Sequence, residues 1–197
     1  FIRTVCLNLA FALFVALSAR IDDVTLAANE VLMMFFTLAS FALDGFANAC
    51  EAIVGQALGS RRRDDLRHAV AAATMWAGLT AAVFCLVFAL VGPLMVAAMT
   101  DLPEVRDVAL AYLPWAALAP LIGVWSFLLD GIFIGATRGR DMRNAMLAML
   151  VIYVPVALVL WQVMGNHGLW LAIWIMMALR AVTLGARWPA LLRSAAP

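Results

Sequence analysis

The feature that most constrains this chain is the long apolar stretch from Leu26 to Gly59, which carries two carboxylates in its second half. As one α-helix the stretch would be about 50 Å long, whereas the hydrocarbon core of a bilayer is about 30 Å thick. Asp44 and Glu51 would then lie at membrane depth, where a carboxylate costs roughly 3 kcal/mol or more. Because such groups face a protein interior or a hydrated path, we expect this helix to belong to a bundle.

The composition places the whole chain in a membrane. Of its residues, 66% are hydrophobic and 13% are charged, whereas roughly a quarter of the residues in a soluble domain are charged. The first residue is Phe1 rather than Met, and no signal-peptide pattern precedes the first apolar run. We therefore interpret the chain as an integral membrane segment of a longer protein.

Six apolar segments, bounded by charges or by Pro and Gly, are each expected to form a transmembrane helix. They lack the alternating pattern of about ten residues that is typical of membrane β-barrels, so the predicted fold class is all-α. The short connections leave no room for a soluble domain, and residues 1–197 are interpreted as one domain. The predicted spans are 2–19, 25–58, 66–99, 104–137, 142–164 and 168–188.

The basic residues, all arginines, predict the orientation. Ten of them lie on one set of alternate connections, and only Arg20 and Arg106 lie on the other. The positive-inside rule then predicts that both termini are cytoplasmic. Arg180 lies inside the last span, where it either reaches the interface along its stem or pairs with a buried carboxylate. The ten are Arg3, Arg61, Arg62, Arg63, Arg67, Arg138, Arg140, Arg143, Arg187 and Arg193.

The long second span carries one polar seam. Thr37, Asp44 and Glu51 are seven residues apart, so each is rotated only about 20° from the last, and Ser40 and Asn48 lie four residues on either side of Asp44. The seam either makes interhelical hydrogen bonds of about 1 kcal/mol each or lines a hydrated cavity that binds protons, cations or cationic substrates. Two carboxylates on one seam favour the cavity.

Asp130 lies toward the cytoplasmic third of the fourth span, two turns before Arg138. It either pairs with an arginine locally or lines the same cavity. His68 and His167 lack a second ligand at metal-binding spacing, so we interpret both as solvated histidines and expect no metal site.

Two pairs of glycines four residues apart, Gly55 with Gly59 and Gly131 with Gly135, predict faces where helices approach closely. Four tryptophans are expected to form an aromatic belt at the membrane interfaces, namely Trp115, Trp161, Trp170 and Trp188.

Asp44 and Gly45 resemble the start of the metal-binding motif of membrane enzymes of the CDP-alcohol phosphotransferase type. The match fails, since Asn48 and Ala49 stand where that motif has Ala-Arg and no acidic pair follows in register. Two metal ions need four or more convergent oxygens. We therefore predict no enzyme and no catalytic residue.

Three separated motifs resemble the DinF-like branch of the multidrug and toxic compound extrusion (MATE) family. They read NEVLMMFFTLASFALDGFANACEAIVGQALGSR at 29–61, LLDGIFIGATRGRDMRNAM at 128–146 and GNHGLWLA at 165–172. Members of this family have twelve helices in two six-helix lobes around a central cavity. The resemblance covers the second lobe, so the first lobe is expected to be missing here.

The resemblance also implies roles for single residues. Asp44, Glu51 and Asp130 match acidic positions of the second lobe. The family's best-known coupling carboxylate belongs to the first lobe, so the coupling ion, H⁺ rather than Na⁺, is expected to bind outside this chain, and no cofactor is expected. Asn8 is the only polar candidate of the first span. At the cytoplasmic end of the second helix the chain matches the family motif at Gly55, Gln56 and Gly59.

The function implied is secondary active transport, a cation-coupled antiport that exports organic cations, drugs or other amphipathic toxic compounds. The expected partners are the missing lobe, the lipid bilayer and small amphipathic or cationic substrates, with no nucleic acid. The expected location is the bacterial inner membrane. The alternative left open is a structural or lipid-handling membrane module without antiport.

Overall fold

The structure is a computed structural model that describes residues 2–59 and 63–194, and every element within these ranges is a helix. Within the described ranges, the connections between the helices are short. The helices are α1 (Ile2–Ser18), α2 (Asp23–Gly59), α3 (Arg63–Met99), α4 (Pro103–Gly135), α5 (Gly139–Met164), α6 (Asn166–Gly185) and α7 (Trp188–Ser194).

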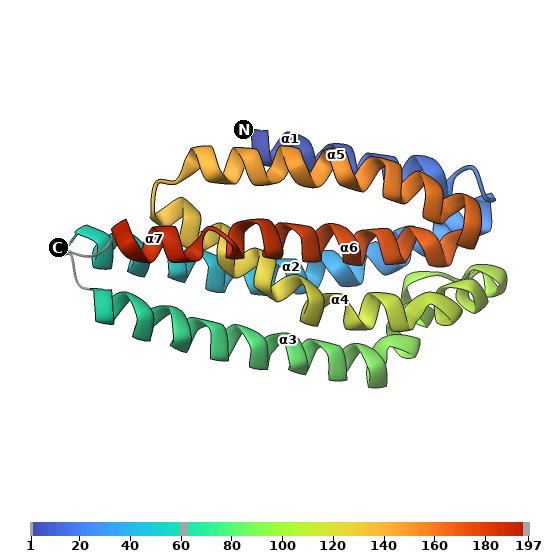
Figure 1. Cartoon of the computed structure of the whole chain (residues 1–197). Coiled ribbons are helices and arrows are strands. Elements are labelled where there is room, and N and C mark those ends of the chain that lie inside the picture. The colour runs from blue at the N-terminus through green and yellow to red at the C-terminus, as the bar shows by residue number, and fades with distance from the viewer. Residues whose placement is uncertain (1, 60–62, 195–197) are drawn as a thin grey trace.

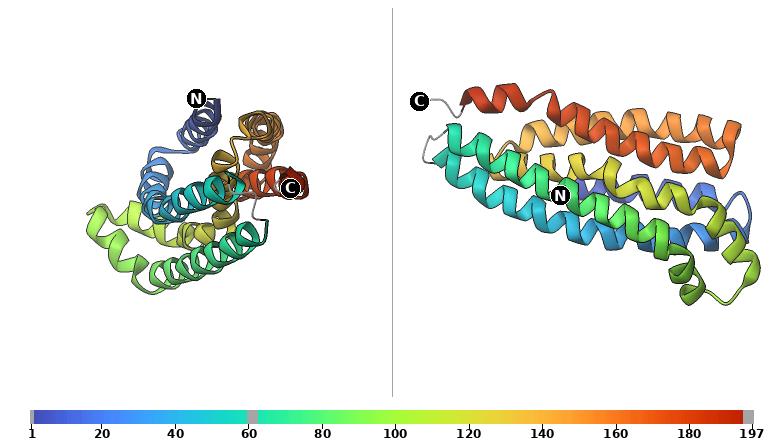
Figure 2. Two further views of the ribbon diagram at one scale, coloured as in Figure 1. Left: turned by 90° about the vertical axis from the view of Figure 1, so that its left-hand side faces the viewer. Right: turned by 90° about the horizontal axis from the view of Figure 1, so that it is seen from below.

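The long helices run side by side, and α4 lies at the centre of the bundle (Figure 1). It packs against α2, α3 and α6, and more lightly against α5, whereas α1 packs mainly against α5. The start of α1, the helix α7 and the α4–α5 connection lie toward one end of the bundle, and the α1–α2, α3–α4 and α5–α6 connections lie at the opposite end (Figure 1). The last turns of α3, which follow Pro93, are bent away from the rest of that helix (Figure 2).

Five helices, α2 to α6, are long and apolar enough to cross a membrane. The first helix, α1, is equally apolar but has only 17 residues, which corresponds to about 25 Å and falls short of the hydrocarbon core. The structure also ends the sixth span at Gly185 and turns the chain into the short helix α7. The sequence analysis instead continued the sixth span to Trp188 and did not predict α7.

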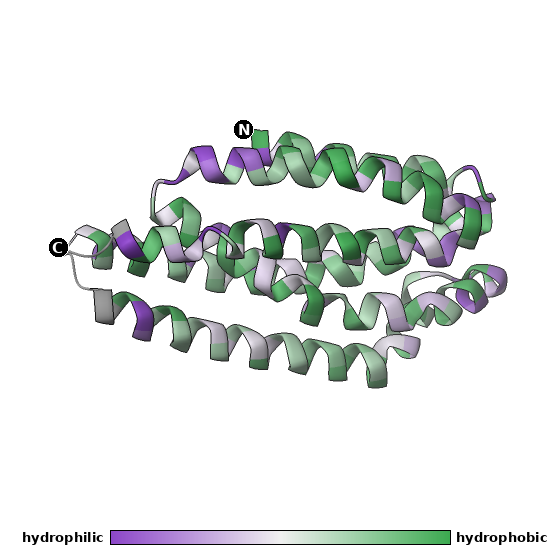
Figure 3. Ribbon diagram, in the orientation of Figure 1, coloured by the Kyte–Doolittle hydropathy of each residue, from purple (hydrophilic) through white to green (hydrophobic). Residues whose placement is uncertain are grey.

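The outer helices present their apolar side chains to the surroundings. Large hydrophobic residues on α3 and α5, such as Leu90, Leu94, Val151 and Val163, are more than 70% exposed. Hydrophilic residues are instead concentrated toward the two ends of the bundle (Figure 3). Apolar side chains at this density are typical of helix faces that lie in an apolar environment.

Close contact between α2 and α4 depends on two of the predicted glycines. A Cβ added at Gly131 would overlap the carbonyl group of Ala47, and a Cβ at Gly135 would overlap that of Glu51. The predicted close approach is therefore confirmed for this pair, whose backbone lies directly against α2. The other pair behaves differently, because a Cβ at Gly55 would make only an ordinary contact and one at Gly59 would meet nothing within 4 Å.

Candidate functional site

A cavity of about 630 Å³ lies between α1, α2, α4 and α6. This volume is in the range of pockets that take drug-sized molecules. Its wall is mostly apolar and aromatic, and its polar groups come mainly from α1, α2 and α6. The lining residues are Arg3, Thr4, Leu7, Asn8, Phe11, Met33, Phe36, Thr37, Ser40, Phe41, Asp44, Phe127, Met177 and Arg180.

The predicted polar seam of α2 divides at Asp44. Thr37, Ser40 and the half-buried Asp44 line the cavity, whereas Asn48 and Glu51 do not. The Thr37 and Ser40 hydroxyls donate to carbonyl groups of their own helix, one turn earlier. After Asp44 along α2, the backbone of Glu51 packs directly against Gly135 of α4. Heptad spacing kept the residues on one stripe, but the tight crossing at the glycines leaves no cavity along the last part of the seam.

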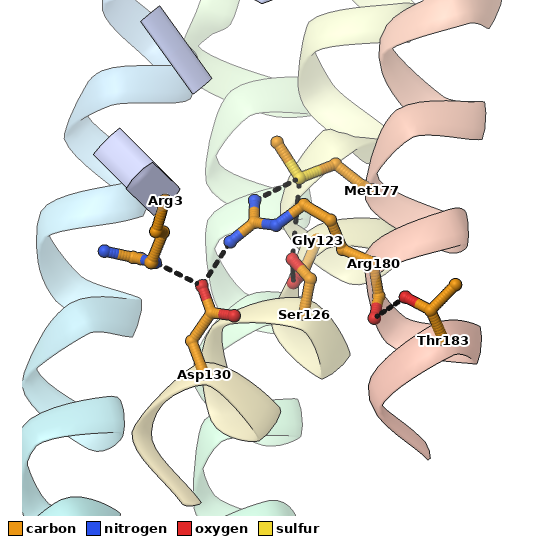
Figure 4. Close-up of polar contacts among 7 residues, drawn as sticks. All are labelled: Arg3, Gly123, Ser126, Asp130, Met177, Arg180 and Thr183. Atoms are coloured by element: carbon orange, nitrogen blue, oxygen red, sulfur yellow. Dashed lines mark hydrogen bonds and ion pairs between the residues drawn. The ribbon is translucent and has the colours of Figure 1, made fainter. Parts of the chain in front are cut away.

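Asp130 and Arg180 form a buried ion pair between α4 and α6. Both residues are 1% exposed. The second oxygen of Asp130, Oδ2, accepts hydrogen bonds from Arg180 Nη2 and, at 2.8 Å, from Arg3 Nε of α1 (Figure 4). Of the two interpretations of Arg180, pairing with a carboxylate is confirmed and reaching the interface is wrong. Asp130 pairs with arginines of other helices, and its carboxylate is not part of the cavity wall.

The surroundings of Arg180 hold its guanidinium in place. Arg180 Nη1 donates to the sulfur of Met177 at 3.3 Å, and the guanidinium lies 5.7 Å from the centre of the Phe127 ring. Ser126 approaches the same sulfur and donates to the Gly123 carbonyl (Figure 4). Two buried polar atoms of the ion pair, Asp130 Oδ1 and Arg180 Nε, nevertheless have no hydrogen-bond partner among the described residues.

A second polar cluster, which we call the Asn29 clamp, joins α1, α2 and α6 and was not predicted. It consists of Ser18, Asn29, Asn166 and Trp170, all less than 5% exposed. The Asn29 amide group donates to Ser18 Oγ at 2.8 Å and to Asn166 Oδ1 at 2.7 Å. Its oxygen accepts from Asn166 Nδ2 at 3.1 Å and from Trp170 Nε1 at 2.9 Å. Both polar atoms of Asn29 are thus fully satisfied.

The clamp corrects one part of the predicted aromatic belt. Trp170 is fully buried, and its ring packs edge-on against Phe14 with 5.4 Å between centroids, so its assignment to a membrane interface was wrong. Trp115 does lie near the end of the bundle, where it donates to His167 at 3.1 Å. The sequence offered one signal for this cluster, namely the polar amide side chains of Asn29 and Asn166 at the starts of the motifs at 29–61 and 165–172.

The remaining candidates lie at the end of the bundle that holds the chain termini. Gly55, Gln56 and Gly59 are exposed in the last turns of α2. Two arginines used for the orientation, Arg61 and Arg62, lie outside the described residues, as does the side chain of Arg63. Among the side chains that the structure describes, no three His, Cys, Asp or Glu residues gather closely enough to hold a metal ion.

The sequence model of the MatE family matches residues 1–159, which is most of the chain. The chain belongs to the MatE family. It is 41% identical over 188 residues to the DNA damage-inducible protein F of Escherichia coli, a match covering 95% of this chain and 40% of that protein. It is 26% identical to Protein DETOXIFICATION 43 of Arabidopsis thaliana, across 92% of this chain and 34% of that one. The resemblance to the DinF-like branch is confirmed.

Solved structures of MATE transporters share the fold of this MatE chain. The match to the eukaryotic transporter AtDTX14 has a TM-score of 0.83 and 22% identity. It covers 94% of this chain and 44% of AtDTX14. An outward-facing multidrug resistance transporter of the family matches 97% with a TM-score of 0.85 and 18% identity, over 45% of its length. The chain therefore spans less than half the length of the relatives that it matches, and the solved relatives are transporters rather than enzymes.

Proposed function

We propose that this chain is one six-helix lobe of a twelve-helix antiporter that exports organic cations, drugs or other amphipathic toxic compounds. The observation that carries this proposal is the cavity of about 630 Å³, in which the Asp44 carboxylate faces a wall of phenylalanines. An apolar wall with one ionisable acceptor suits an amphipathic cation. In this proposal α1 is the sixth transmembrane helix, and its short length is accommodated by local thinning of the bilayer or by snorkelling of flanking residues.

Transport would depend on the protonation of Asp44. The ionised carboxylate attracts a cation, and the protonated acid does not, so proton uptake and substrate binding compete at one group. Asp130 is excluded from this role because Arg180 and Arg3 already neutralise its charge. Exchange between the two sides of the membrane then requires the lobe to move as a unit against a partner lobe.

Two matches support movement of the lobe as a unit. The outward-facing structure matches the fold with a TM-score of 0.85, and an inward-facing one matches with 0.81. We further infer that the partner lobe lies opposite the cavity and supplies the main coupling site, with H⁺ rather than Na⁺ as the ion. We also infer that the protein lies in a bacterial inner membrane with both ends of this segment in the cytoplasm, because most arginines lie at that end.

The test uses the full-length protein that contains this chain, reconstituted in liposomes loaded with a fluorescent organic cation. We expect efflux on imposing a proton gradient and none on imposing a sodium gradient alone. Asp44→Asn is expected to reduce efflux at least tenfold. Glu51→Gln is the matched control and should retain most of the activity, because Glu51 does not line the cavity.

Efflux that needs no ion gradient, or that survives Asp44→Asn, would contradict the proposal. The lipid-handling alternative is tested in the same liposomes with a headgroup-labelled lipid. Movement of that lipid between leaflets without movement of the dye would replace antiport by lipid handling.

A further inference from the structure

The cavity carries more positive charge than its proposed substrate class requires. Three charged residues line it, and two of them are the arginines Arg3 and Arg180. The charged groups within electrostatic reach of Asp44 are Arg3, Asp130 and Arg180. A pocket selected only for cations would not be expected to place two guanidinium groups in its wall, because each repels a cationic substrate.

Arg3 has an unused hydrogen-bonding edge. Its guanidinium donates to Asp130 through Nε alone, and its two terminal nitrogens make no hydrogen bond within the described residues. The side chain is 30% exposed, whereas that of Arg180 is 1% exposed. A guanidinium has two edges that can each bind a carboxylate in a bidentate manner. In Arg3 one edge is turned to Asp130, and the other remains for a second carboxylate.

Arg180 adds a second positive charge next to Arg3. It shares the Asp130 oxygen with Arg3, so a single carboxylate serves two guanidinium groups (Figure 4). The buried Nε of Arg180 has no hydrogen-bond partner in the part of the chain that the structure describes. Because this side of the cavity contains two cations for one anion, its local charge is positive and attracts a further anion.

The opposite charge is available at Asp44, which comes from α2, whereas Arg3 and Arg180 come from α1 and α6. The two guanidinium groups and the two carboxylates of this region sum to zero. A bound cation or a bound anion would leave the cavity charged, and a molecule that carries both charges would not.

We propose that Arg3, supported by Arg180, forms a carboxylate subsite in this cavity, so that the preferred ligand is an amphipath carrying both a carboxylate and a cationic group. The carboxylate binds the free edge of Arg3, the cationic group faces Asp44, and the apolar body lies against the phenylalanines. This inference rests on the proposed export function and narrows its substrate class.

The test compares two dyes of nearly equal size. Rhodamine B carries a carboxylate and a delocalised cation at neutral pH, and its ethyl ester is a cation only. Affinities for the full-length protein in detergent are measured by fluorescence anisotropy. We expect wild-type protein to bind rhodamine B about tenfold or more tightly than the ester, as the loss of a hydrogen bond between charged groups implies.

Arg3→Gln is expected to weaken binding of rhodamine B by about tenfold and to leave binding of the ester unchanged or tighter. Arg3→Lys, which keeps the charge but loses the bidentate edge, should fall between the two. Arg140→Gln is the matched control, because Arg140 is an exposed arginine outside the cavity wall, and it should change neither affinity.

Two results would overturn the subsite. One is a wild-type protein that binds the ester as tightly as rhodamine B. The other is an Arg3→Gln variant that weakens both dyes equally, since a structural role of Arg3 would not distinguish them. Binding and transport of the ester that depend on Asp44 would then leave the proposed export function standing, whereas failure of both dyes to be transported would remove that function itself.

Discussion

The same three helices, α1, α2 and α6, meet twice in this molecule, and the two meeting places differ in chemistry. In the Asn29 clamp they contribute Ser18, Asn29 and Asn166, and all the interactions are between neutral groups. At the cavity they contribute Arg3, Asp44 and Arg180. Along each helix the two places are 14 or 15 residues apart, which is about 20 Å.

The two places also differ in how completely their polar groups are satisfied. In the clamp every polar atom of Asn29 has a partner, whereas beside the cavity Asp130 Oδ1 and Arg180 Nε have none. A satisfied neutral network rigidifies helix contacts, and a buried ion pair with unsatisfied atoms is costly to hold. We conclude that the clamp ties the three helices together, whereas the charged cluster holds ionised groups beside the cavity.

The largest effect is expected from removing the buried carboxylate. Asp130→Ala leaves Arg180 buried without its partner and should lower the free energy of unfolding by about 3–5 kcal/mol. The measurement is denaturant unfolding of the full-length protein in detergent. The control is Asp101→Ala, because Asp101 pairs with Arg106 while fully exposed to solvent, and it should cost less than about 1 kcal/mol.

The same experiment includes a rescue. Replacing both partners, Asp130→Leu with Arg180→Met, removes both buried charges and should restore most of the stability. An Asp130→Ala protein as stable as the wild type would show that Arg180 finds another partner or reaches water.

An intermediate effect is expected in the clamp. Asn29→Ala leaves Ser18, Asn166 and Trp170 with buried polar groups unpaired, and should cost about 2–3 kcal/mol. Asn8→Ala is the matched control, because Asn8 is an exposed amide on an apolar helix. Equal losses for the two variants in the same unfolding measurement would remove the clamp's assigned role.

The smallest effect is expected at the start of α2, near the clamp. Asp22 accepts hydrogen bonds from the backbone N–H and the hydroxyl of Thr25, at 2.7 and 2.8 Å, and the first of these is the main reason why its pKa lies below the ordinary value of 3.8. Asp22→Ala should cost about 0.5 kcal/mol at pH 7.

The pH dependence at Asp22 has a definite sign. A carboxyl group whose pKa is lowered by folding adds stability above its unfolded pKa and loses it as the pH falls through the folded value. The difference between Asp22→Ala and wild type should therefore shrink below about pH 4. A difference that grows in acid would contradict the capping role.

The sequence predicted the helices well because their signal is local. Apolar runs and charged connections locate α2 to α6, and the spacing of Gly131 and Gly135 predicted a close helix approach without identifying α2 as the partner helix. The α6–α7 turn was missed because the sixth span was extended past Arg187 to Trp188. A heptad count alone also could not show that the seam on α2 leaves the cavity after Asp44, because the glycines of α4 decide where the backbones touch.

The polar partners were harder to predict because they are far apart in the sequence. Asp130 and Arg180 were each recognised as costly in a membrane, but the third member, Arg3, was counted only as an orientation signal. Asn29 and Asn166 are separated by 137 positions, and a single neutral amide in an apolar run is a weak signal. The sequence thus identified which charges need partners, and only the packing of α1, α4 and α6 shows which partners they have.

The most direct test of this account compares ion-driven dye efflux per folded molecule for Asp44→Asn and Asn29→Ala in the full-length protein. The account predicts that Asp44→Asn folds normally and loses at least tenfold in efflux, whereas Asn29→Ala is less stable and transports at close to the wild-type rate once normalised to folded protein. Normal efflux by Asp44→Asn, or a greater loss of normalised efflux in Asn29→Ala, would contradict it.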